Sequence, residues 1–204
     1  MAVPQLPVRS PVLRMTEEEF VAWCDEDTRA EFLDGEVIIM SPEAARNEQL
    51  RWLVGGTLKA FVEHHKLGKV YGPNLQVSLR VGRRRIPDLL FIRTDRLHLL
   101  AETHFEGEPD LVMEIVSPDS AARDWHDKFL EYEASGVREY WVIDPQLYRV
   151  DAYAPNATGR YELLPLTKGV HRSAIVPGFY LRPESLSQEP LPTMLDLLRE
   201  LGIW

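Results

Sequence analysis

Two short segments with the same pattern constrain the fold of this chain most strongly. Each begins with Pro-Asp and continues as an apolar run, at residues 87–92 and at residues 109–116. Runs of this length and composition are typical of strands that are buried inside a sheet. The second run contains a glutamate, Glu114, near its far end. A carboxylate inside a buried strand is costly unless it is paired, hydrogen-bonded or bound to a metal, so Glu114 is the first candidate functional residue.

Length and composition indicate one compact domain. The chain has 204 residues, of which 45% are hydrophobic, and this is enough to bury a substantial core. We expect the proline-rich residues 1–14 to be extended or disordered and residues 15–204 to form a single domain. No apolar run reaches the length that spans a bilayer, and the first residues lack a basic segment followed by a hydrophobic one. We therefore predict no membrane association and a cytoplasmic location, and the single cysteine agrees with a reducing compartment.

Helical and strand patterns alternate along the chain. Thr16 with Glu19 three residues later is a capping-box signature at the start of a helix, and Asp34-Gly35 is a strong hairpin signal. The other predicted helices cover residues 44–66 (ended by Gly68), 119–135 and 195–201. The predicted strands lie at residues 29–40 (the hairpin), 69–80, 87–92, 109–116, 137–143, 149–154, 160–164 and about 170–174, with loops at 82–85 and 94–108. This order predicts an α/β protein in the broad α+β sense, with a mixed β-sheet flanked by helices.

The acidic residues of the two Pro-Asp segments suggest a metal site. Asp110 and Glu114 are four residues apart, so on one strand they stand about 13 Å apart, which is too far to share an ion. Asp88 begins the neighbouring strand candidate, and adjacent strands lie close enough to bring Asp88 and Glu114 onto one cation. Oxygen ligands without His or Cys suit Mg²⁺ or Mn²⁺, which activate water and stabilise charge on phosphate oxygens.

A lysine would complete this arrangement by holding the attacking water or by neutralising developing charge. Two residues after Glu114 the chain has Val116 instead, and the nearest candidate is Lys128, one helix later. Asp124, Lys128 and Tyr132 follow at four-residue steps, so they occupy one face of that helix. A helix packed beside the Glu114 strand could direct Lys128 back to the site.

Together these motifs resemble the bacterial Uma-type family of putative restriction endonucleases, part of the PD-(D/E)XK nuclease superfamily. The resemblance covers about residues 15–185. The segments that carry it are Glu31-x-x-x-Gly35-Glu36, Pro87-Asp88, residues 114–118, Asp124-x-x-x-Lys128-x-x-x-Tyr132, residues 136–145 and residues 176–179. It implies a restriction-endonuclease-like fold and Mg²⁺-dependent hydrolysis of phosphodiester bonds in DNA.

The resemblance also implies roles for individual residues. Asp88 and Glu114 match the two acids of the superfamily motif, both metal ligands, and the carbonyl of Ile115 is a natural further ligand. Lys128 matches the position to which the lysine has moved in this family, and Glu31 matches its early acidic residue. Val116 in place of the motif lysine is the departure from the parent pattern, so catalysis depends on Lys128 reaching the site.

Each of these residues also has a purely structural interpretation. Glu114 could be a buried acid neutralised by an arginine, Lys128 a solvated helix residue, and Glu31 a flank of the hairpin. The basic run at residues 83–85 could contact phosphate or could simply be solvated. The net charge of −9 argues against non-specific binding of nucleic acid, although local basic patches remain compatible with it.

Three functions remain open at this stage. The first is an active metal-dependent DNA endonuclease, which the motifs favour. The second is a catalytically silent nuclease fold that binds nucleic acid or a protein, and the third is a metal-dependent hydrolase of another phosphate ester. A homodimer is expected, because duplex cleavage often uses two sites and the last helix offers Leu195, Leu198 and Trp204 for pairing.

Overall fold

The computed structural model describes residues 12–25, 28–40, 44–116 and 121–204, with the side chains of residues 121–125 excepted. Most of the segment that we expected to be extended or disordered, residues 1–14, lies outside these ranges. So do the start predicted for the third helix and the side chain of Asp124.

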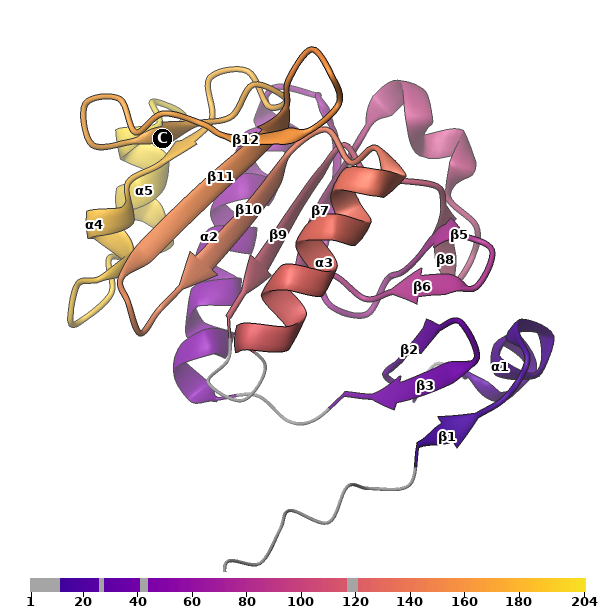
Figure 1. Cartoon of the computed structure of the whole chain (residues 1–204). Coiled ribbons are helices and arrows are strands. Elements are labelled where there is room, and N and C mark those ends of the chain that lie inside the picture. Colours follow the sequence, from indigo (N-terminus) through magenta and orange to yellow (C-terminus); the bar gives the residue numbers. More distant parts are fainter. Residues whose placement is uncertain (1–11, 26–27, 41–43, 117–120) are drawn as a thin grey trace, which may run out of the picture.

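A six-stranded mixed sheet forms the centre of the molecule (Figure 1). Its strands, in spatial order, are β12 (Tyr161–Leu163), β11 (Arg149–Pro155), β10 (Tyr140–Asp144), β9 (Leu111–Ile115), β7 (Leu89–Arg93) and β4 (Gly68–Tyr71). Strands β9 and β10 are parallel, and the other neighbours are antiparallel. Helix α2 (Ala45–His64) covers one face and helix α3 (Ala121–Ser135) covers the other (Figure 1). The predicted mixed sheet between helices is confirmed.

Successive side chains of β9 point to opposite faces of the sheet, and this alternation divides the core into two layers. Leu111, Met113 and Ile115 pack into the larger cluster, which includes the apolar side of α2. Val112 points to the opposite face and packs with Tyr132 of α3. Because successive strand residues face opposite sides, Glu114 shares the α3 face with Val112. The sequence of β9 therefore turns its one acid toward α3.

A second six-stranded sheet, which the sequence analysis did not predict, lies beside the first. Its strands, in spatial order, are β1 (Leu13–Arg14), β3 (Glu36–Ile39), β2 (Ala30–Leu33), β6 (Arg83–Arg85), β5 (Gln76–Arg80) and β8 (His104–Glu106). The predicted hairpin between β2 and β3 is confirmed, with Asp34 and Gly35 both at positive φ. The predicted first helix is confirmed as α1 (Glu17–Trp23), with a complete capping box between Thr16 and Glu19.

The basic run at residues 83–85, predicted as a loop, is strand β6. It pairs with β2 on one side and with β5 on the other. The arginines can lie in a partly buried strand because acidic side chains meet them, as Glu17 meets Arg84 at 2.8 Å. The prediction was wrong because it treated three consecutive arginines as exposed.

Three other boundaries also differ from the prediction. Residues 69–80 form two strands, β4 and β5, rather than one. Residues 94–108 are not a simple loop, since they contain a 3₁₀ helix, η1 (Thr94–Leu99), and strand β8. Helix α2 ends at His64, and Lys66 takes the left-handed conformation that terminates it, whereas Gly68 already belongs to β4.

The C-terminal part packs against α2. It contains β13 (His171–Arg172), β14 (Tyr180–Leu181), α4 (Pro183–Leu186) and α5 (Met194–Glu200). Leu198, which we expected to be exposed for dimer formation, is buried, while Leu195 and Trp204 are exposed. The correction follows from α5 packing its apolar side onto α2. Among the described residues, no helix is long and apolar enough to cross a bilayer.

The two Pro-Asp segments are related by the antiparallel pairing of β7 and β9. The Asp88 carboxylate accepts a hydrogen bond from the Ile115 N–H at 2.8 Å, at the end of β9. At the opposite end of the pair, the Asp110 carboxylate accepts one from the Arg93 N–H at 2.9 Å. Each aspartate thus binds the backbone at the far end of the other strand. The continued register sets an acid, Glu114, opposite Asp88, whereas Asp110 lies opposite the apolar Ile92 of β7.

Gly68 is required by the close approach of β4 to β7. A Cβ atom at Gly68 would lie 2.0 Å from the carbonyl oxygen of Ile92, which is backbone and cannot swing away. We predict that Gly68→Ala lowers the free energy of unfolding by about 2 kcal/mol or more. Gly72→Ala is the matched control, because a Cβ atom there meets no atom within 4 Å. Denaturant unfolding measures both, and equal stability of the two variants would contradict this account.

Candidate active site

Asp88 and Glu114 are neighbours across two strands, as the sequence analysis predicted. The register pairs Leu89 with Met113, and one further step along the antiparallel pair sets Asp88 opposite Glu114. Side chains at such opposed positions have Cβ atoms about 4.5–5.5 Å apart. Both acids are buried. Asp110, which we excluded from the site on spacing, lies at the other end of the pair with Arg96 and Arg138.

Both carboxylate oxygens of Glu114 accept hydrogen bonds from α3. The ammonium group of Lys128 lies 3.0 Å from Oε2, and the hydroxyl of Tyr132 donates to Oε1 at 2.8 Å. Lys128 and Tyr132 are one helical turn apart, so they reach the same carboxylate side by side. Lys128 is buried, so the interpretation of Lys128 as a solvated helix residue is wrong. The cation that pairs with Glu114 is a lysine rather than the arginine considered for the structural alternative.

Burial and charge shift the pKa values of this group of residues in a consistent way. Burial raises the pKa of Glu114 to about 7, assisted by the neighbouring negative charges of Asp88 and Glu31 and opposed by Lys128. Burial alone would lower the pKa of Lys128, but Glu114, Glu31 and Asp88 outweigh it and raise this pKa. The pKa of Tyr132 is also raised, chiefly by burial. Lys128 is therefore a permanent cation near neutral pH and Tyr132 a permanent hydroxyl donor, whereas Glu114 exchanges its proton there.

Asp88 is held by the backbone of β9 and by a side chain from α2. Its Oδ2 accepts from the Ile115 N–H, and its Oδ1 lies 3.0 Å from Nη2 of Arg51. Arg51 also pairs with Glu48, one turn earlier on α2. The sequence analysis missed both α2 residues. Their i, i+3 spacing was the available signal, but such a pair is ordinarily an exposed one.

Glu31 is a third buried acid near this pair. One of its oxygens lies 2.6 Å from Nη1 of Arg85, and the other accepts from the Ile86 N–H at 3.1 Å. Burial acts to raise the pKa of Glu31, but Lys128 and Arg85 outweigh it and lower this pKa. Arg85 in turn binds Glu131 of α3 at 2.7 Å. Glu31 therefore does more than flank the hairpin, because it links the second sheet to the site and stays ionised.

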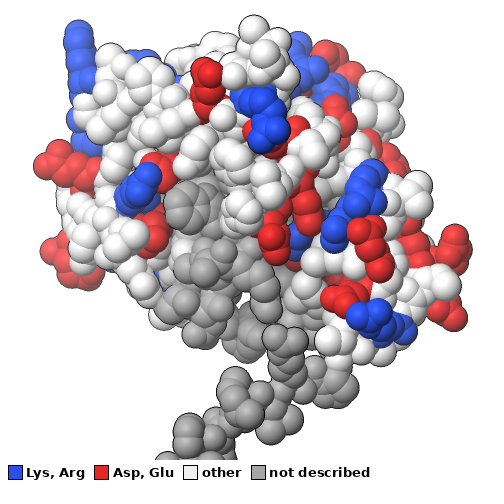
Figure 2. All heavy atoms as spheres, viewed as in Figure 1, with Lys and Arg blue, Asp and Glu red and all other residues white. Residues whose placement is uncertain are grey.

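Acidic side chains neutralise the basic run at residues 83–85. Besides the pairs made by Arg84 and Arg85, Arg83 lies 3.0 Å from Asp34. Over the described residues of one face, Figure 2 shows Lys and Arg interspersed with Asp and Glu rather than gathered in a continuous basic band. The run is neither simply solvated nor a free phosphate-binding loop.

The described acids suit one hard cation that keeps part of its water shell. Within the described part of the chain, no group of three or more His, Cys, Asp or Glu side chains is placed to hold a metal. Mg²⁺ does not need such a group, because it usually binds through one or two carboxylates with water and substrate oxygens. The Ile115 N–H points to Asp88, and in a strand the C=O of a residue points to the same side as its N–H. Asp88, Glu114 and the Ile115 carbonyl are therefore oxygen donors of the kind that Mg²⁺ takes, and the Asp88 carboxylate lies on the side of β9 to which the Ile115 carbonyl points.

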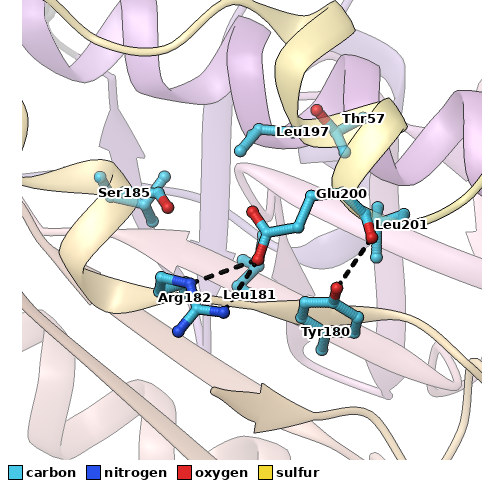
Figure 3. A pocket seen from close by; sticks show the side chains of 9 residues that line it. Thr57, Tyr180, Leu181, Arg182, Ser185, Leu197, Glu200 and Leu201 are labelled. Carbon is cyan, nitrogen blue, oxygen red and sulfur yellow. Dashed lines mark hydrogen bonds and ion pairs between the residues drawn. The ribbon is translucent and has the colours of Figure 1, made fainter. Parts of the chain in front are cut away.

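A separate hollow between α2, β14, α4 and α5 is too small to be a substrate site. Its volume is about 10 Å³, which is room for one water molecule. Figure 3 shows Glu200 at its centre, where the carboxylate meets Arg182 and the backbone oxygen accepts from the Tyr180 hydroxyl. These contacts fasten α5 to the C-terminal strand.

Comparisons with known proteins bear on the family and the fold of the chain. Residues 17–184 match the Uma2 family, which is described as "Putative restriction endonuclease". A crystal structure of a protein described as a putative nuclease belonging to DUF820 from Anabaena variabilis superposes with a TM-score of 0.72. That protein is 18% identical to this chain, and the match covers 85% of this chain and 97% of the other. At this identity the similarity shows the shared fold. No curated protein matches the chain.

The buried pair of Glu114 and Lys128 predicts a pH-dependent loss of stability. The pKa of Glu114 in the folded state, about 7, exceeds its ordinary value, so folding is favoured at low pH and weakened as pH rises through 7. Lys128→Met removes the cation and raises this pKa further. We expect it to lower the free energy of unfolding by about 3–5 kcal/mol at pH 8 and by less at pH 5.5, where Glu114 is protonated.

Denaturant unfolding at the two pH values measures this difference. Lys59→Met is the control, because Lys59 forms an exposed pair with Glu63 on α2 and its loss costs little at either pH. A Lys128→Met variant with the same deficit at both pH values would show that Glu114 does not titrate in this range.

Proposed function

The chain belongs to the Uma2 family of putative restriction endonucleases, and on that basis we propose that it is a Mg²⁺- or Mn²⁺-dependent endonuclease that hydrolyses phosphodiester bonds in DNA. The observation that carries the proposal is the position of Lys128. Its ammonium group, supplied by a helix, lies 3.0 Å from Glu114 although the strand has Val116 where the superfamily motif has lysine. The acid and the cation that the proposed nuclease site requires thus lie side by side, and this contact supports the proposal.

Asp88, Glu114 and the Ile115 carbonyl are the proposed ligands of the cation. A bound Mg²⁺ or Mn²⁺ stabilises negative charge on a phosphate oxygen and lowers the pKa of water. Asp88 is oriented by the backbone of β9, and Glu114 is oriented by Tyr132, so neither carboxylate has to be ordered when the ion arrives. Each oxygen keeps a second lone pair beyond the hydrogen bond that it accepts.

Lys128 has the proposed role of a fixed positive charge beside the reacting phosphate. Its raised pKa keeps it protonated, so it donates hydrogen bonds to an attacking water or to a phosphate oxygen and neutralises charge that develops there. Glu31 and Arg85 support it from the second sheet, since the ionised Glu31 favours the charged lysine and Arg85 balances Glu31. Glu31 therefore acts on the position and charge of Lys128 in this proposal.

One observation favours a catalytically silent protein as the second candidate. The described acids of the site already bind cations or N–H groups of the chain, and most described arginines are paired with carboxylates. Such a protein would keep the fold for binding nucleic acid or a partner protein.

For the active enzyme we also propose a homodimer that cuts both strands, with the exposed Leu195 and Trp204 near its contact surface.

Cleavage of DNA tests the proposed function directly. We expect the purified protein to cut supercoiled or single-stranded DNA with Mg²⁺ or Mn²⁺ and not with a chelator. Glu114→Gln removes a metal ligand and Lys128→Met removes the fixed charge, so each should reduce the rate by about 100-fold or more. Gel assays of initial rate, run below the unfolding temperature of every variant, give the comparison.

Asp110→Asn is the matched control for these substitutions. Asp110 has the same Pro-Asp context and is buried, but it lies at the other end of the strand pair, so its rate should stay near that of the wild type. Full activity of Glu114→Gln would identify a contaminating nuclease. A small phosphodiester hydrolysed faster than any DNA would favour the alternative of another phosphate ester as substrate.

A further inference from the structure

Pro145 interrupts the backbone pairing of β9 with β10 at the site end of the sheet. These strands are parallel, and the N–H of Val116 donates to the Ile143 carbonyl at 2.9 Å. In a parallel pair, a residue that donates to one residue of its neighbour accepts from the residue two positions further along. The donor for the Val116 carbonyl would therefore be the N–H of residue 145. That residue is proline, which has no N–H, so the strand that carries Glu114 reaches its last carbonyl without a donor from β10.

Asn47 of α2 supplies the missing donor. Its Nδ2 donates to the Val116 carbonyl at 3.2 Å, and Asn47 is buried. A buried amide is costly unless it is hydrogen-bonded, and a carbonyl acceptor requires that its NH₂ group, rather than its oxygen, face the strand. One turn later on the same helix, Arg51 lies 3.0 Å from Asp88. Helix α2 thus contacts both strands of the pair at the end that holds the two acids.

The peptide that carries the Ile115 carbonyl lies between these contacts. A trans peptide is planar, so the Ile115 C=O and the Val116 N–H point in opposite directions from one rigid unit. Because Ile143 holds the N–H, the carbonyl points away from β10, to the side of β9 where Asp88 accepts from the Ile115 N–H. The Val116 carbonyl belongs to the next peptide unit, which Asn47 holds. The Asn47 contact therefore opposes fraying of the strand end back to Ile115.

We propose that Asn47 is a positioning residue of the metal site: it takes the place of the donor that Pro145 lacks and so holds the end of β9 in the geometry that binds the ion. The proposal rests on the metal site of the proposed function, in which the Glu114 carboxylate and the Ile115 carbonyl are ligands. Asn47 acts through the backbone of Val116 and contacts neither the ion nor the substrate. A strand end that is ordered beforehand spares the ion the cost of ordering its ligands, so Asn47 raises the affinity of the site for Mg²⁺ or Mn²⁺.

Binding of Mn²⁺ without nucleic acid tests this role independently of activity. Isothermal titration calorimetry at fixed pH and ionic strength compares the full-length wild type with Asn47→Leu, which keeps a similar volume and removes the donor. We expect the variant to bind Mn²⁺ about tenfold more weakly, an effect typical of residues that orient metal ligands. Without metal, amide hydrogen exchange at residues 114–116 should be faster in the variant than in the wild type, because the strand end opens more often.

Tyr180→Phe is the matched control, because it removes a hydrogen bond of the same kind and also keeps the volume of the side chain. The Tyr180 hydroxyl donates to the backbone carbonyl of Glu200 at 2.9 Å, in the C-terminal part of the chain. This variant should bind Mn²⁺ within about twofold of the wild type and leave hydrogen exchange at residues 114–116 unchanged. Equal weakening of Mn²⁺ binding in the two variants would show a general loosening of the fold and would contradict a specific role of Asn47.

Pro145→Ala tests the mechanism, because an alanine at this position has the N–H that the parallel register directs to the Val116 carbonyl. Added to Asn47→Leu, it should restore most of the lost affinity for Mn²⁺, whereas alone it should change the affinity by no more than about twofold. A double variant that binds Mn²⁺ as weakly as Asn47→Leu would refute the replacement of one donor by the other.

The outcomes separate this inference from the proposed function. If the wild type binds Mn²⁺ and Asn47→Leu binds it equally well, Asn47 only fastens α2 to the sheet and the positioning role is refuted, while the metal site stands. Hydrogen exchange in the wild type decides the matter if Asn47→Leu does not fold, because a Val116 N–H that exchanges as fast as an unprotected amide refutes a held strand end. If neither the wild type nor any variant binds Mn²⁺, the metal site of the proposed function fails and the positioning role fails with it.

Discussion

The antiparallel pairing of β7 with β9 determines where the candidate functional residues lie. The register of this strand pair sets Asp88 opposite Glu114. It also lets the aspartate of each Pro-Asp segment accept a hydrogen bond from the backbone of the other strand. A shift by one residue would turn Glu114 away from α3 and into the apolar layer beneath α2. The two aspartate contacts, at opposite ends of the pair, oppose such a shift. The same contacts that fix the register therefore also fix the acids of the site.

The burial of the site makes its charges interdependent. A buried carboxylate is tolerated only with partners, and here each partner comes from a different part of the chain: Lys128 from α3, Arg51 from α2 and Arg85 from the second sheet. Removal of one partner leaves an uncompensated charge, which costs more than the pair contributes to stability. The second sheet is thus electrostatically coupled to the site, because the charge of Glu31 raises the pKa values of Lys128 and Glu114.

Local signals in the sequence predicted the local structure and the acids. The capping box at Thr16, the turn at Asp34-Gly35 and the apolar runs of β7 and β9 each depend on a few adjacent residues. The second sheet was missed because its strands are short and pair across long stretches of sequence, so hydrophobic periodicity gives little indication of them. Arg51 was missed for a related reason. A charged side chain on a helix is ordinarily solvated, and only the packing of α2 against the end of β7 places this one beside Asp88.

If the proposed function holds, the supply of the lysine from a helix rather than from the strand has a consistent physical explanation. Val116 is partly buried against the apolar cluster on the α3 face of the sheet, so a lysine there would lose that packing. A lysine from α3 reaches Glu114 from above the sheet instead, beside a tyrosine that occupies the other carboxylate oxygen. For the proposed reaction, the position of the ammonium group relative to the carboxylate matters, and the backbone element that supplies it does not. The helix does impose a condition, because the site now depends on how α3 packs on β9 and β10, and the aromatic cluster of Tyr132, Tyr140 and Tyr161 fixes that packing.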